Sequence, residues 1–293
     1  MIGLSVEEGV GKVIVNPYKK DDKVLVSKVT NFRGLKEGIL NSVDLIGGFD
    51  RIVGKGDKIL LKPNFNTADA PPGSSDPEFV RAVIELLYKH GAGKVVLGES
   101  SMLRLSTRKV LEQTGMLKNA EEAGAEMMFF DEGKWVNVKT GGKYLRKVSL
   151  PETALEAEKV VYVSCMKTHR WAKFTLSLKL AVGFMEPKER IKLHMRRLEE
   201  KIADLNLIVH PNLIIMDGRK CFISGGPAKG ELRNPNIIMA SGDRIAMDVE
   251  ALKTIGSFEG TSLKDSPWSY TQIRRAVELG LGVKNEHEYN VIK

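Results

Sequence analysis

The chain has 293 residues, of which 42% are hydrophobic and 28% charged, and its net charge of +8 favours anionic ligands in general without singling out nucleic acid. No apolar run approaches the roughly 18 residues of a membrane-spanning helix, the first residues lack a secretory signal, and two cysteines are too few for a disulfide scaffold. We therefore expect a soluble, cytoplasmic protein with no membrane partner.

Strands and helices alternate along the chain. Apolar runs predict strands over 57–62, 94–97, 126–130, 159–164, 212–216 and 236–240. Helical spacing predicts helices over 77–90, from 107 onward, through most of 174–209, and over 245–255 and 270–279. The alternation predicts an α/β fold with a mostly parallel sheet and helices on both faces, formed by residues 1–293 as one unit with two closely packed lobes, 1–157 and 158–293.

Polar segments directly follow four of the predicted strands. They are Lys62–Asn66, Gly98–Ser100, Cys165–His169 and Asp217–Gly230. The carboxyl ends of parallel strands meet at one edge of a sheet, and that edge is where open α/β proteins bind ligands. We therefore expect these segments to form one cleft.

The first group of candidate catalytic residues is Lys167, His169, Lys179 and His194. Cations in this position suit an acidic substrate or a phosphate, and a lysine kept uncharged by burial suits covalent or base chemistry. The alternative is a solvated basic loop whose histidine bonds a backbone carbonyl. His194 lies in a charged run, 187–201, that otherwise resembles a solvent-exposed helix face.

Further candidates follow the other strands. Glycines after Asp217 would expose backbone N–H groups to an anion, or would merely allow an irregular crossover loop to turn. A carboxylate and amides at the same edge would orient a polar ligand or a metal-bound water, or would cap the helices that follow. The candidate ligand-binding residues are therefore Lys62, Asn64, Asn66, Glu99, Ser100, Asp217, Gly225 and Gly226.

Several familiar motifs are absent from the sequence. It contains no phosphate-binding loop, dinucleotide fingerprint, nucleophile elbow, zinc motif or self-contained iron–sulfur cluster motif. Cys165 and His169 are weak candidates for metal ligands, with Cys221 as a third donor. A buried or weakly reactive thiol is the simpler interpretation of Cys165.

Several segments, in their order, resemble the DUF362 family over residues 58 to 256. They are Lys62–Asn64, Asp76–Val83, Gly98–Ser100, Met166–His169, Thr175–Lys179, Ile202–Asn206, Asp217–Gly218, Gly225–Pro227 with Gly230, and Ala246–Asp248. Many members of that family carry an appended ferredoxin-type module. The resemblance therefore implies a ferredoxin-type redox partner, although this chain itself lacks such a module.

A more distant resemblance is to the lactate racemase family, in which a histidine, a cofactor-tethering lysine and a second histidine follow one another. His169, Lys179 and His194 have a similar order and spacing. By that resemblance Lys179 would tether or anchor a cofactor, His169 would be a metal ligand or base, and His194 would be an acid/base partner.

These observations lead to one main functional hypothesis and two alternatives. The main hypothesis is an enzyme for a small anionic carboxylate or phosphate, with proton transfer by His169 and charge neutralisation by Lys167 and Lys179. The first alternative is a redox protein whose cluster is supplied in trans, or by homo-oligomerisation through Cys165 and Cys221. The second is a nucleic-acid-binding protein that uses the basic helix 188–201.

Overall fold

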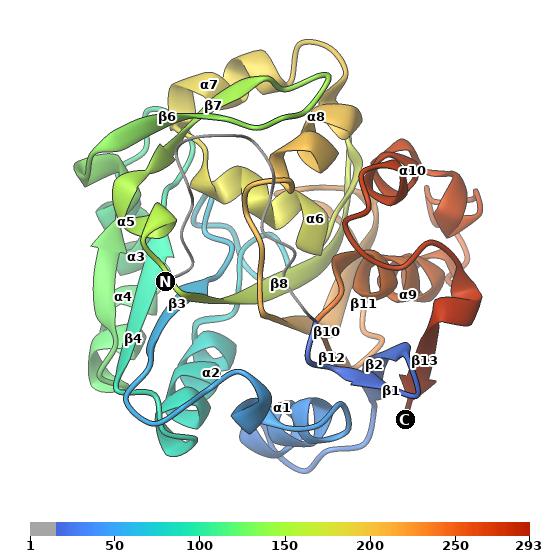
Figure 1. Ribbon diagram of the computed structural model, residues 1–293, viewed down its shortest axis with the longest axis horizontal. Helices are drawn as coiled ribbons and strands as arrows, with labels where there is room; N and C mark the ends of the chain where they lie inside the picture. The colour runs from blue at the N-terminus through green and yellow to red at the C-terminus, as the bar shows by residue number, and fades with distance from the viewer. Residues whose placement is uncertain (1–15) are drawn as a thin grey trace.

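The computed structural model describes residues 16–293, which form an α/β protein around one eleven-stranded sheet (Figure 1). Along the sheet the strand order is β1 (Lys19–Lys20), β2 (Lys23–Val29), β12 (Ile237–Ser241), β10 (Leu213–Gly225), β8 (Lys159–His169), β3 (Lys58–Lys62), β4 (Lys94–Glu99) and β5 (Glu126–Phe129). Three shorter strands extend it, with β9 (Lys173–Thr175) on β8, β11 (Gly230–Arg233) on β10 and β13 (Tyr289–Ile292) on β2.

The five strands from β10 to β5 are parallel, as the sequence predicted. Strand β12 runs antiparallel to both β10 and β2. It does so because the chain turns back through the β10–β11 hairpin instead of crossing over a face through a helix. The mostly parallel sheet is therefore confirmed, with an antiparallel margin on the side of β12.

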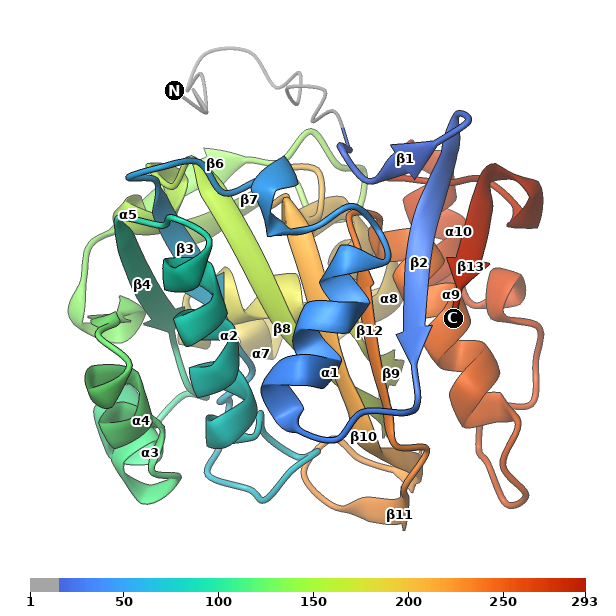
Figure 2. The ribbon, with the colours of Figure 1, turned by 90° about the horizontal axis from the view of Figure 1, so that it is seen from below.

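Helices cover both faces of the sheet (Figures 1 and 2). One face carries α1 (Leu35–Asp44), α2 (Pro77–Lys89), α3 (Thr107–Gln113) and α4 (Met116–Glu122). The other carries α6 (Ser177–Leu180), α7 (Pro187–Leu193), α8 (Leu198–Leu205), α9 (Arg244–Gly256) and α10 (Thr271–Glu278). A separate hairpin of β6 (Trp135–Lys139) and β7 (Lys147–Pro151) leads into α5 (Glu152–Leu155).

Alternation along the strands builds two cores, one on each face. In β8, Val161 and Val163 pack with α1 and α2, whereas Val160 and Tyr162 pack in the core beneath α8 and α9. Successive side chains of a strand point to opposite faces, so a strand buried on both faces must be apolar throughout. This requirement explains why the parallel strands were recognisable as continuous apolar runs.

The structure corrects three expectations about the elements. Strand β8 continues to His169, so residues 165–169 belong to the strand and not to a loop after it. Strand β10 likewise continues to Gly225 and pairs with β11, so the expected irregular loop 217–230 is mostly a β-hairpin. The stretch 174–209 begins in β9 and is divided into short helices, with Pro187 starting α7 and a left-handed Arg197 preceding α8.

Additional elements near the two ends were not predicted. Strand β2 and helix α1 precede the first predicted strand, and β13 follows the last predicted helix. Between residues 16 and 293, the structure contains no helix that combines the length and the apolar character needed to cross a bilayer.

The hairpin that ends β10 lies close against β8, and Gly226 makes this contact possible. A Cβ atom added to Gly226 would lie 2.0 Å from the carbonyl oxygen of Thr168, and the residue has a φ of +66°. Both the close approach and the left-handed backbone exclude other residues at this position.

We predict that Gly226→Ala lowers the free energy of unfolding by about 2 kcal/mol, because a left-handed backbone and a backbone clash each disfavour alanine. Urea denaturation measures the change. Gly133→Ala is the matched control, since Gly133 is extended with φ −102° and its nearest neighbour would lie at 3.7 Å. Equal stability of the two variants would contradict this role for Gly226.

Candidate functional site

A cavity of about 530 Å³ opens at the carboxyl ends of β3, β4 and β8. It is bounded by the loops that follow β3 and β4, by the end of β8, and by α6 and α7. Nine of the residues singled out from the sequence line it: Lys62, Asn64, Asn66, Glu99, Ser100, Lys167, His169, Lys179 and His194. Residues from four separate chain segments therefore meet at one cavity, at the edge expected for a parallel sheet.

Lys62 and Glu99 form a buried ion pair at the floor of the cavity. Their Nζ and Oε1 atoms are 2.6 Å apart, and each side chain is 1% exposed. The carboxylate also accepts hydrogen bonds from the backbone N–H groups of Phe65 and Ser100, at 2.8 Å each. Burial lowers the pKa of Lys62, and Glu99 opposes that change. The pair therefore neutralises itself and leaves no free carboxylate for a ligand.

Lys167, Lys179 and Arg190 also line the cavity, and Glu99 is the one carboxylate that the described residues place in its wall. Lys167 donates to the carbonyl of Gly73 at 2.5 Å and is 2% exposed. The side chain of Lys179, which lines the cavity, has neither a hydrogen bond nor an ion pair to any of residues 16–293. Burial lowers the pKa of Lys167. Three basic side chains therefore face the cavity without an ion pair to any carboxylate of the described residues.

Arg190 was not singled out from the sequence, although it is the most extensively bonded side chain of the site. Its guanidinium donates to the carbonyls of Ser100, Gly183 and Met185 and to the hydroxyl of Ser100, at 2.7 to 3.1 Å. Burial lowers its pKa to about 10. All these acceptors are neutral, so Arg190 fixes the cavity wall without an ion pair, and the charges of Glu99 and Asp131 only partly oppose the effect of burial on its pKa.

The surroundings of Lys179 in the cavity change its pKa. Burial, together with the neighbouring charges of Lys167 and Arg190, lowers the pKa of Lys179 to about 7. A lysine of this kind is present in both its protonated and its neutral form near pH 7. It can therefore hold an anion in one form and accept a proton in the other.

His169 is held in one tautomer by the backbone. Its Nδ1 accepts hydrogen bonds from the N–H groups of Trp171 and Ala172, at 3.1 Å each. Nδ1 is therefore unprotonated and the proton of the neutral ring is on Nε2. Burial lowers the pKa of His169 to about 2, with further contributions from Lys179, His194 and Lys167.

This tautomer changes the role expected for His169. A ring that carries its proton on Nε2 donates a hydrogen bond, whereas a metal ligand or a general base needs a free lone pair. In this geometry the ring of His169 has no free lone pair for the expected role of metal ligand or base. A neutral hydrogen-bond donor beside the cations is what the structure provides.

His194 has the complementary arrangement. Its Nδ1 donates to the carbonyl of Arg190 at 2.6 Å, which leaves the Nε2 lone pair free. Its ring lies 6.2 Å from that of His169, centroid to centroid, at the solvent-accessible mouth of the cavity. Partial burial lowers the pKa of His194. The two histidines therefore offer one donor and one acceptor.

The position of Lys179 is set by residues that carry the family resemblance. The buried carboxylate of Asp248 accepts hydrogen bonds from the N–H groups of Ser177 and Leu178, at 2.8 and 3.0 Å, and from the Ser177 hydroxyl at 2.6 Å. Asn206 donates to the carbonyl of Leu178 at 2.9 Å. These bonds hold the first two residues of the short helix α6 and thereby fix the start of the helix that carries Lys179.

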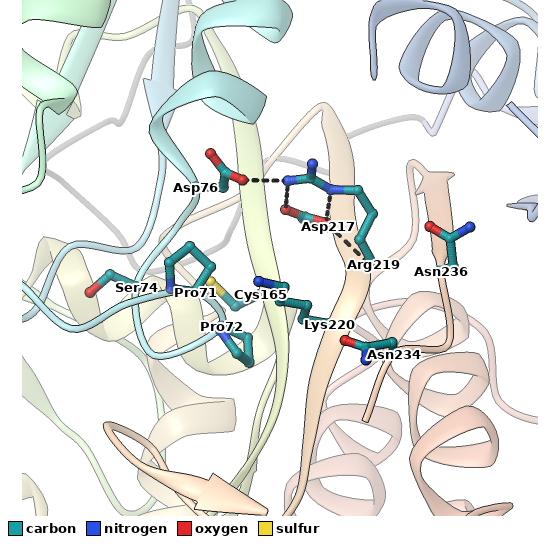
Figure 3. A pocket seen from close by; sticks show the side chains of 10 residues that line it. All are labelled: Pro71, Pro72, Ser74, Asp76, Cys165, Asp217, Arg219, Lys220, Asn234 and Asn236. Atoms are coloured by element: carbon teal, nitrogen blue, oxygen red, sulfur yellow. Dashed lines mark hydrogen bonds and ion pairs between the residues drawn. The ribbon is translucent and has the colours of Figure 1, made fainter. Parts of the chain in front are cut away.

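Asp217 and Cys165 lie elsewhere, in a second pocket of about 320 Å³ (Figure 3). Asp217 pairs with Arg219, which also pairs with Asp76, all at 2.7 Å. The expectation that Asp217 joins Glu99 in one cleft is therefore wrong. The reason is that β10 extends beyond Asp217 and a register shift follows that residue.

Gly225 and Gly226 also do not line the main cavity. Gly225 pairs with Gly230 in the hairpin, and the N–H of Gly226 donates to the carbonyl of Lys229 at 2.8 Å. Their backbone is left-handed, as expected of glycines, but the expected anion site is not formed because the hairpin uses that N–H group. The residues that follow, Pro227 and Ala228, reach the cavity instead.

The described residues hold no group of three or more His, Cys, Asp or Glu side chains placed to bind one metal ion. Cys221 is packed in the core under α9, and Cys165 borders the second pocket with its Sγ 3.7 Å from the hydroxyl of Ser75. Burial raises the pKa of both thiols, to about 12 for Cys221. The expected metal set of Cys165, His169 and Cys221 is therefore not brought together.

Fold and site together define an α/β protein with a cationic cavity at the carboxyl edge of its parallel strands. Within this class the chain belongs to the DUF362 family, described as a domain of unknown function, which it matches over residues 59–253. The family membership predicted from the sequence is confirmed.

A thylakoid-associated protein of Synechocystis sp. is 29% identical over 211 residues, which cover 69% of this chain and 64% of that protein. The lactate racemase apoprotein of Thermoanaerobacterium thermosaccharolyticum has a TM-score of 0.41 and 10% identity, over 77% of this chain and 56% of that one. A Thermotoga maritima protein has a TM-score of 0.42 and 11% identity, over 75% and 57%. This chain thus spans less than two thirds of the length of each of these proteins.

We predict that Glu99→Gln lowers the free energy of unfolding by about 3 kcal/mol, because it leaves Lys62 charged and buried without its partner. Chemical denaturation at neutral pH measures the loss. The control is the double variant Lys62→Met/Glu99→Gln, which removes both charges and should recover much of the stability. A single variant as stable as the double variant would show that the pair is not energetically coupled.

Proposed function

We propose that the cavity binds a small organic anion, a carboxylate or phosphate, and that the protein is an enzyme that moves a proton on it. One observation carries the proposal. Lys167, Lys179 and Arg190 face a cavity in which the one carboxylate contributed by residues 16–293, that of Glu99, is already paired with Lys62. Burying charges without partners is unfavourable, and an anionic ligand would supply the missing negative charge.

The wall of the cavity suits a ligand that is only partly polar. Apolar side chains, among them Phe65, Leu180 and Val182, line it beside the cations. A volume of about 530 Å³ is within the range of small-molecule sites. An anionic group held by Lys167 and an adjacent carbon framework against the apolar wall would fill such a space.

The geometry supports Lys179 as the proton acceptor. In its neutral form, the Nζ lone pair would take a proton from the carbon next to a carbonyl or carboxylate group. The C–H electron pair would then move onto the carbonyl oxygen, and the N–H of His169 Nε2 and the charge of Lys167 would stabilise that oxygen. The free Nε2 of His194 is placed to accept or return a second proton. In this proposal the base is Lys179, whereas the sequence analysis expected proton transfer by His169.

We predict that anion affinity falls as the pH rises through about 7. The pKa of Lys179 is about 7, so the residue carries its charge below that pH and loses it above. Isothermal titration calorimetry with sulfate and with a panel of small carboxylates, whose own charges do not change near pH 7, measures the effect. Lys179→Met should abolish the pH dependence in this range. The control Lys188→Met changes an exposed lysine paired with Glu186 and should leave it intact.

The proton-transfer part of the proposal has a separate test. A wild-type protein incubated with the carboxylate panel in D₂O should exchange the hydrogen next to the carboxylate of its substrate, as followed by NMR. Lys179→Met should lower that rate by at least 10²-fold, since general base catalysis contributes about that much. Binding without any exchange across the panel would contradict the enzyme assignment while leaving the anion site standing.

A further inference from the structure

The mouth of the cavity is surrounded by exposed apolar side chains. Within the described part of the chain, eight large hydrophobic residues are exposed. Four of them line the cavity, and two more lie within four residues of one of these in sequence. The six are Met102, Leu103, Leu105, Trp171, Ile191 and Met195. Trp171 is 72% exposed and Met195 74%. We call these six residues the apolar rim.

The apolar rim comes from three separate segments, which are the loop after β4, the turn between β8 and β9, and the end of α7. Side chains packed in a core come together because they bury one another, but those of the apolar rim protrude individually into solvent. An exposed apolar cluster of this kind on a folded protein marks a surface that something else covers.

Basic residues are interleaved with the apolar rim in the same three segments. They are Arg104 between Leu103 and Leu105, Arg170 and Lys173 around Trp171, and Lys192 and Arg196 around Ile191 and Met195. All five are exposed, and none forms an ion pair with any residue from 16 to 293. Two nearby carboxylates are engaged elsewhere, Glu186 with Lys188 and Glu189 with Ser149. Glu199 interacts with Lys173 electrostatically but forms no ion pair with it.

We propose that this face docks on the surface of an anionic lipid bilayer. The apolar rim would enter the boundary between headgroups and acyl chains, and the five basic side chains would contact lipid phosphates. Long cationic side chains beside buried apolar ones are well suited to this position, because their stems lie against apolar atoms while their charges stay in the headgroup region.

Two other occupants fit the surface less well. A nucleic acid would use the five cations but would leave six apolar side chains in water. A protein interface would accommodate the tryptophan, methionine and arginine side chains, but its core is depleted in charged residues. Five unpaired charges would there have to leave water without lipid phosphates to receive them. A bilayer would bind both the apolar side chains of the rim and the five basic side chains. This inference replaces the expectation of no membrane partner and does not rest on the proposed function.

Docking in this way would place the cavity mouth against the bilayer, since Met102, Leu103, Trp171 and Ile191 belong both to the apolar rim and to the cavity lining. The cavity would then receive its anion from the membrane surface or from the water layer next to it.

Vesicle sedimentation of the full chain tests the proposal. We expect co-sedimentation with phosphatidylcholine vesicles that contain phosphatidylglycerol, and much weaker binding to pure phosphatidylcholine. The double variant Trp171→Glu/Ile191→Glu should bind at least tenfold more weakly. The control is Leu45→Glu/Leu232→Glu, which alters two residues exposed at 36% and 43% outside the apolar rim and should bind like the wild type.

A second pair of variants tests the charges. Arg170→Gln and Lys173→Gln should each weaken binding about fivefold, the factor expected for one basic residue near an anionic surface. Lys179→Met should bind vesicles normally, which separates this proposal from the anion site. No sedimentation of the wild type, equal binding to both vesicle types, or equal losses in the rim variant and its control would each overturn the proposal.

Discussion

Uncompensated positive charge in the cavity is the constraint on which the rest of the site depends. Lys62 and Glu99 cancel one another, whereas Lys167, Lys179 and Arg190 have only neutral acceptors or none among the described residues. In a partly buried space such charges interact strongly, because little water screens them. Burial lowers the pKa values of Lys179 and His169, and these charges lower them too. An anionic ligand would supply the missing negative charge.

The fold holds these charges together by means of rigid elements. Strand β8 carries Lys167 and His169 directly, and Asp248 on α9 fixes the short helix that presents Lys179. Gly183 lets Lys62 pass, because a Cβ atom there would lie 2.7 Å from the lysine Nζ. The apolar rim opens at the same edge of the sheet, so the site and the proposed membrane surface share their boundary.

Sequence patterns predicted the parts that depend on local chemistry. The parallel strands are apolar on both faces, and Asp76 with Pro77 begins α2 as expected. The features of the site that sequence patterns did not predict depend on tertiary contacts. Arg190 lies in a charged run typical of a solvent face, yet the loop after β4 folds over it. Asp217 does not line the predicted cleft, because β10 continues past it as a strand. No local sequence pattern indicated that the strand would continue.

The ionisation of Lys179 in the ligand-free protein tests this account most directly. NMR titration of the side-chain signals of lysine-labelled protein, with Lys179 assigned by comparison with Lys179→Met, would give its pKa. We expect a pKa near 7 for Lys179, and a higher pKa when an anion is bound. An ordinary lysine pKa near 10.4 in the ligand-free protein would contradict this expectation. Lys179 would then be neither desolvated nor repelled by unpaired positive charges in the cavity.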